Sequence, residues 1–151
     1  MQQVSKIGEC TANAKRSAAA IAWVSILLGA LSGMVLGLWS FEGPVRTPDW
    51  IGPYDSLPRR FLRLAHIALF ALGMLYLFVA RQVTEAPVGP EIARIALFMM
   101  GLGTVAMPAV LIGAALWEPI KFLSAIPAFA ITTAVFIAAV SALRQTEGAW
   151  R

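Results

Sequence analysis

The sequence predicts an all-α integral membrane protein, a four-helix bundle that forms one transmembrane domain over residues 1–151. Composition is the first indication, because 59% of the residues are hydrophobic and 13% are charged, whereas soluble domains carry about 25% charged residues. Charge spacing is the second: charged residues leave four uncharged stretches of 25, 17, 23 and 22 residues. A helix crosses the apolar core of a bilayer in about 20 residues. Because backbone groups in lipid must be paired within the segment, each stretch predicts a membrane-spanning helix.

The first two expected spans cover residues 17–40 and 58–81. The first follows Lys15 and Arg16, which resemble the start of a signal peptide. Its apolar stretch is longer than the roughly 7–15 residues of a signal peptide, so we interpret this span as an uncleaved anchor. The second is preceded by Ser56, a residue type that caps helices.

The third and fourth expected spans cover residues 91–116 and 121–143. Glu91 lies in the first turn of the third span, where the helix dipole favours a negative charge. Glu118 lies between the two spans and Lys121 follows it closely. We therefore expect Glu118 to be a solvated or paired charge at the membrane interface.

Lysine and arginine counts set the expected orientation, because cytoplasmic loops are enriched in both. The side that holds both termini and the 81–94 loop carries seven of these residues, and the other side carries five. Lys15 and Arg16 precede the first span, and Glu42 follows it. We expect both termini to lie in the cytoplasm.

The expected outer loop, residues 41–57, contains three prolines and two glycines, which disfavour a helix. Trp39, Trp50, Tyr54 and Trp117 lie on the same predicted side. Tryptophan and tyrosine prefer the membrane interface, because the ring is apolar and carries one polar atom. We interpret the loop as an ordered connector with interfacial anchors; the functional alternative is a lid or a docking surface.

Small residues recur at helical spacing on two of the spans, in a glycine-zipper pattern on the first. The two stripes are Ser25, Gly29, Gly33 and Gly37 on the first span, and Ala130, Ala134 and Ala138 on the fourth. Small residues let two helix backbones approach closely in lipid. The stripes predict close helix contacts, and they leave open whether the partner helix belongs to this chain or to another subunit.

His66 is the single histidine and the only ionisable residue within the apolar run of the second span. Arg59, Arg63 and His66 lie at positions i, i+4 and i+7, so a helix places them on one face. An ionisable group inside a membrane span is a candidate functional site, and this face suits a quinone headgroup, a haem propionate or a lipid phosphate. In the simpler alternative, His66 hydrogen-bonds a carbonyl or a headgroup near the helix end. A bis-histidine haem would need a second histidine.

Other kinds of site find no support in the sequence. The single cysteine, Cys10, cannot form an intrachain disulfide. One shallow histidine does not make a Ser–His–Asp set, and no cluster has metal-ligand spacing. The net charge of +4 comes from span ends and loops, not from the basic, aromatic-rich face that nucleic-acid binding requires. We expect no catalytic residue, no metal site and no nucleic-acid partner.

Two stretches of the chain carry a resemblance to a known group of proteins. Leu57 to Ala68 (LPRRFLRLAHIA), and Met107-Pro108 followed by Trp117-Glu118-Pro119, resemble uncharacterised small four-span bacterial membrane proteins of unknown function. The resemblance covers roughly the middle half of the chain. In that group a glycine precedes the histidine and a second histidine follows the Trp-x-Pro turn, where this chain has Ala65 and Phe122. The departure argues against a two-histidine site, and the resemblance implies no activity.

Three functional hypotheses follow. The first is a non-enzymatic accessory or structural subunit that packs through the Gly29/Gly33/Gly37 stripe, with itself as a homo-oligomer or within a larger, respiratory membrane complex. The second is a quinone-, haem- or lipid-binding membrane protein that uses Arg59, Arg63 and His66. The third is a small transporter or channel, which would need a polar path. Membrane lipid and other membrane subunits are the expected partners, and the bacterial inner (plasma) membrane is the expected location.

Overall fold

The computed structural model of the chain describes the backbone of residues 2–40, 43–85 and 88–149, and side chains from residue 13 to residue 145 within those ranges. It contains four long helices and one short 3-10 helix. In chain order these are α1 (Gln2–Leu38), α2 (Leu57–Glu85), α3 (Pro90–Leu116), η1 (Glu118–Ser124) and α4 (Ala125–Ala149). No strand occurs in the described residues, so the prediction of an all-α four-helix bundle is confirmed.

Each expected span corresponds to one helical segment that is long and apolar enough to cross a membrane. These segments are Asn13–Leu38, Leu57–Glu85, Pro90–Leu116 and Glu118–Gln145. The boundaries differ most at α1, which begins at Gln2 and not at residue 17. Charged residues mark where a chain leaves lipid, whereas a helix pairs its own backbone groups and continues beyond that point.

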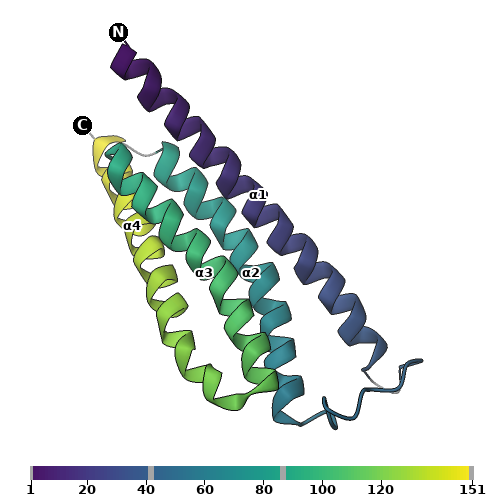
Figure 1. Cartoon of the computed structure of the whole chain (residues 1–151). Coiled ribbons are helices and arrows are strands. Elements are labelled where there is room, and N and C mark those ends of the chain that lie inside the picture. Colours follow the sequence, from purple (N-terminus) through teal and green to yellow (C-terminus); the bar gives the residue numbers. More distant parts are fainter. Residues whose placement is uncertain (1, 41–42, 86–87, 150–151) are drawn as a thin grey trace.

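The four helices lie side by side in the order of the chain, as Figure 1 shows. α1 packs on α2, α2 on α3 and α3 on α4, with smaller contacts of α1 with α3 and of α2 with α4. Within the described residues, α1 and α4 make no contact. Both termini lie at one end of the bundle, and the 43–56 loop and η1 lie at the other, which we call the loop end (Figure 1).

The outward faces of the helices are apolar. Trp23, Phe98 and Phe136 are 61%, 65% and 67% exposed. Large apolar side chains exposed in this way along long helices are typical of surfaces that face lipid. The lengths of the helices and their apolar surfaces together make the chain a multi-pass membrane protein.

Small residues occupy contacts inside the bundle. On α4 these are Ala130, Ala134 and Ala138, which are 2%, 0% and 8% exposed. On α3, a Cβ added at Gly103 would lie 2.3 Å from Cγ1 of Ile131 on α4. In lipid the hydrophobic effect does not drive helices together, so membrane helices associate through close packing at small residues.

Local polar contacts order the loop end. The predicted pairing of Glu118 is confirmed, because its Oε1 lies 2.6 Å from Nζ of Lys121. The hydroxyl of Ser56 donates to the carbonyl oxygen of Ile51 at 2.5 Å. Since the side chain of Ile51 is fully buried, the 43–56 loop is folded against the helices.

Candidate functional site

α1 and α2 approach each other at small residues of the predicted stripe. A Cβ added at Gly29 would lie 2.9 Å from the backbone nitrogen of Phe70, so only glycine allows the two backbones to come this close. One turn earlier, Ser25 donates its hydroxyl to the carbonyl oxygen of Leu69 at 2.7 Å. A Cβ added at Gly37, by contrast, would meet no atom within 4 Å. The stripe therefore faces α2 of the same chain at Ser25 and Gly29, and is open at Gly37.

His66 is held against α1 through one of its ring nitrogens. Its Nδ1 lies 2.8 Å from the carbonyl oxygen of Gly29 and 3.3 Å from the hydroxyl oxygen of Ser32. Because a carbonyl only accepts, Nδ1 carries a proton and donates it. Gly33 makes room for the ring, since a Cβ there would lie 2.5 Å from Cε1 of His66. In a neutral imidazole with the proton on Nδ1, Nε2 is an acceptor, and no described residue donates a hydrogen bond to it.

A cavity of about 270 Å³, which we call the His66 cavity, lies at this contact. Apolar and aromatic side chains make up most of its wall. Its lining residues are Ser32, Val35, Leu36, Trp39, Trp50, Leu62, Ala65, His66, Leu69 and Ile112. The hydroxyl of Ser32 is already used, because it donates to the carbonyl oxygen of Gly29 at 2.9 Å. The remaining wall of the cavity is therefore apolar apart from the side chains of His66 and the two tryptophans.

A larger groove of about 690 Å³ runs between α1 and α3, with Leu69 of α2 also in its wall. It shares with the His66 cavity the lining residues Ser32, Val35, Leu69 and Ile112, so the two spaces are adjacent. Each hydroxyl that lines the groove donates to a helix carbonyl oxygen: Ser25 to Leu69, Ser32 to Gly29 and Thr104 to Met100. The groove therefore offers a long apolar surface beside the cavity that His66 lines.

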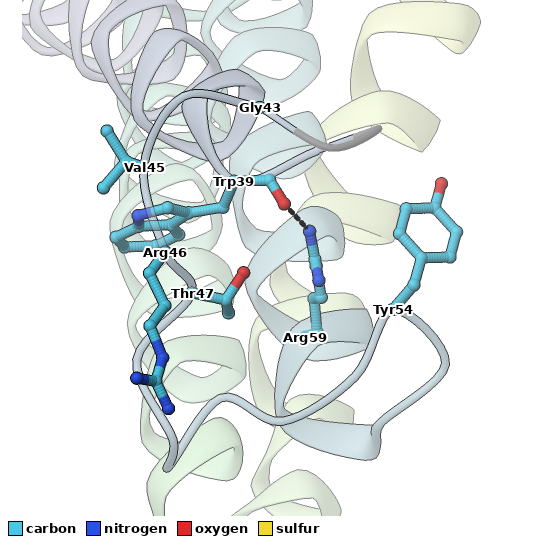
Figure 2. Close-up of a pocket in the computed structure, with 7 residues that line it drawn as sticks. All are labelled: Trp39, Gly43, Val45, Arg46, Thr47, Tyr54 and Arg59. Atoms are coloured by element: carbon cyan, nitrogen blue, oxygen red, sulfur yellow. Dashed lines mark hydrogen bonds between the residues drawn. The ribbon is translucent and has the colours of Figure 1, made fainter.

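A second cavity, of about 510 Å³, lies within the 43–56 loop and is shown in Figure 2. We call it the loop pocket. It is lined by Trp39, Gly43, Val45, Arg46, Thr47, Tyr54 and Arg59. The loop bends around this space, and Arg59 enters it from the first turn of α2 (Figure 2).

Arg59 is the buried cation of this region, with 7% of its surface exposed. Its Nη2 donates to the carbonyl oxygen of Trp39 at the end of α1. The ring of Tyr54 contacts two guanidinium groups, with its centre 5.1 Å from Cζ of Arg59 and 4.2 Å from Cζ of Arg63. Both distances are within the range of a cation–π interaction, which anchors the loop to the start of α2.

The three residues predicted to form one face do not share one cavity. Arg59 lines the loop pocket, and His66 lines the cavity beside α1. Arg63 lines neither of these two, and its Nη2 donates to the carbonyl oxygen of Tyr54 at 3.3 Å. Trp39 lines both cavities and stands between them.

Several residues at these sites are missing from the sequence-based prediction. Ser32 precedes a glycine of the stripe, and its proximity to His66 depends on how α1 crosses α2. Thr47 lies in a loop, where no periodicity indicates the direction of a side chain. Ile112 and Ala109 come from α3, which no motif connects with α1.

Comparisons of this chain with models of known protein families, with curated proteins and with solved structures give no match. Among the described side chains, no group of three or more His, Cys, Asp and Glu residues is placed to hold a metal ion.

Proposed function

We propose that this chain is a non-enzymatic membrane protein that binds one amphipathic lipid-like molecule. The apolar tail of that molecule lies in the groove between α1 and α3, and its polar end reaches His66. The adjacency of the groove and the His66 cavity, which share four lining residues, is the observation that carries the proposal. A bacterial inner membrane with both termini in the cytoplasm is the location that we propose with it.

The groove is accessible from the lipid phase. Its wall includes exposed side chains on both helices, among them Leu28 at 48%, Leu31 at 48% and Val105 at 60% exposure. In a membrane these side chains face acyl chains, so a tail enters sideways without crossing water. Because the hydroxyls of the groove are paired with backbone carbonyls, a flexible hydrocarbon chain fits the wall better than a polar solute does.

The hydrogen bonding of His66 indicates the chemistry of the polar end. Nδ1 donates to Gly29, so the neutral ring offers a lone pair at Nε2. A hydroxyl group complements this acceptor, whereas a carbonyl does not. We therefore favour a ligand with a hydroxyl at its polar end, such as an isoprenoid quinol or an acyl lipid with a free hydroxyl.

The accessory-subunit hypothesis is the less favoured reading of the small-residue stripe. Gly29 faces Phe70 and Gly33 faces His66 within the same chain. A partner subunit that packs against the stripe would have only Gly37 and its surroundings available.

Purification in a mild detergent followed by native mass spectrometry and lipid extraction tests the proposal. We expect one molecule of a hydroxyl-bearing amphiphile per chain. Ala109→Trp fills the groove from α3 and should remove most of the bound molecule. Ala128→Trp on the exposed face of α4 is the matched control and should retain it. A wild-type protein that carries no such molecule, or an Ala109→Trp variant that carries as much as wild type, would refute the proposal.

His66→Asn tests the polar end separately. The asparagine amide supplies an N–H donor near the position of Nδ1 but has no counterpart of Nε2. We expect its thermal unfolding temperature in detergent to remain near the wild-type value while the bound amphiphile is lost. His66→Ala, which removes both nitrogens, should lower both quantities. Full retention of the amphiphile by His66→Asn would show that Nε2 does not contact it.

A further inference from the structure

The loop pocket contains a buried positive charge that the described residues do not neutralise. Burying a guanidinium group costs several kcal/mol unless an anion or a full set of hydrogen bonds compensates for the lost water. The ion pairs of the described side chains are Arg46–Asp49, Arg81–Glu85, Arg94–Glu91 and Lys121–Glu118. All of these are at least partly exposed, and Arg59, the buried arginine, is in none of them.

Most of the hydrogen-bonding capacity of Arg59 is unused within the described chain. A guanidinium group has five N–H donors in a planar fork. One of these N–H donors, on Nη2, donates to the carbonyl oxygen of Trp39. The aromatic ring of Tyr54 lies over the guanidinium, with its centre 5.1 Å from Cζ. The contact with Tyr54 involves the face of the guanidinium plane and not the N–H groups at its edge. These N–H groups therefore remain available to donate to a ligand in the pocket.

Thr47 adds a second hydrogen-bonding group to the same space. In Figure 2 both Thr47 and Arg59 line the pocket, and the guanidinium is directed at the carbonyl oxygen of Trp39. Thr47 has no hydrogen-bond partner among the described residues. Arg46 also lines the pocket, but its guanidinium points away from Arg59 and pairs with Asp49 at 3.5 Å.

We propose that the loop pocket is an oxyanion site that takes a phosphate or carboxylate group. The planar fork of Arg59 suits two oxygens of such a group, and the hydroxyl of Thr47 suits a third. The anion would supply the negative charge that the described residues do not provide for the buried guanidinium. The group can come from an anionic lipid headgroup at the membrane surface or from a small solute. This site is separate from the groove and does not depend on the function proposed above.

Thermal unfolding of the detergent-purified full chain with increasing inorganic phosphate tests the solute source. Phosphate should raise the unfolding temperature of wild type. Arg59→Gln should weaken phosphate binding by about tenfold or more, because a charge-assisted hydrogen bond is lost. Arg60→Gln is the matched control, since it removes the same charge from the neighbouring exposed position. Thr47→Val should weaken binding by about threefold, and it keeps the shape of the side chain.

Native mass spectrometry from nanodiscs of equal phosphatidylglycerol and phosphatidylcholine tests the headgroup source. Preferential retention of phosphatidylglycerol by wild type and Arg60→Gln, and its loss in Arg59→Gln, would identify a lipid headgroup. A phosphate response without this preference would identify a solute. The proposal is overturned if neither probe distinguishes wild type from Thr47→Val and Arg59→Gln, or if Arg60→Gln loses as much binding as Arg59→Gln. Ala109→Trp should leave both responses intact, whatever the groove binds.

Discussion

At the scale of single residues, His66 combines an observed contact with α1 and the ligand contact that we propose. Nδ1 donates to the Gly29 carbonyl and holds α2 against α1. The His66 side chain also lines a cavity that lies beside the α1–α3 groove. A hydrogen bond between membrane helices contributes about 0.6 kcal/mol on average, so the structural role alone is modest. In our proposal the second nitrogen gives this histidine its further role as a ligand contact.

Gly33 and His66 should be energetically coupled, because the ring occupies the space that a Cβ at position 33 would need. Gly33→Ala should destabilise the wild-type protein by about 1–3 kcal/mol, the usual cost of overpacking. In a His66→Ala background the same substitution should cost less than about 0.5 kcal/mol. Unfolding free energies of the four proteins in one detergent give the coupling directly. Equal costs in both backgrounds would contradict the placement of the ring against Gly33.

At the scale of elements, the α1–α2 contact depends on backbone proximity at Gly29. A methyl group there would lie 2.9 Å from a backbone nitrogen of α2, and that atom cannot move without the helix. Gly29→Ala should therefore cost about 1–3 kcal/mol.

Gly37→Ala is the matched control for that substitution, because nothing lies within 4 Å of the added atom. It should be neutral or stabilise the helix by up to about 1 kcal/mol, since alanine has the higher helix propensity. Thermal unfolding of the two variants distinguishes them. A similar loss in both would place the important partner of the stripe outside this chain.

Charge spacing locates the helices of this chain but not their ends or their neighbours. The uncharged stretches mark the four spans because lipid excludes charges. The same criterion misses the start of α1 at Gln2, since a helix outside lipid contains charged residues freely. Sequence spacing also does not reveal that Arg59 and His66 belong to different sites. Both lie on one side of α2, yet the loop and α1 place them in different cavities. That division depends on tertiary packing around Trp39, which no local pattern contains.

At the scale of the whole molecule, the bundle has two chemically different ends. Both termini lie at one end, and the 43–56 loop lies at the other (Figure 1). Single-cysteine variants in a Cys10→Ser background test the proposed orientation. Asp49→Cys, at a side chain that is 92% exposed, should react with an impermeant maleimide in intact cells. Arg144→Cys, exposed at the opposite end, should react only after the membrane is opened. The reverse pattern would invert the orientation.

The side-by-side order of the helices also has a consequence for biogenesis. Because the extensive helix contacts join neighbours in the chain, each helix after α1 finds a neighbouring helix already in the bilayer. The hairpin of α1 and α2, with Gly29 against Phe70 and His66 against Gly29, needs nothing that is synthesised after residue 85. The nascent chain can thus form its first glycine contact early, since such chains assemble from the N-terminus. The α3 wall of the groove is missing until α3 inserts, so the lipid tail that we propose can be enclosed there only after that step.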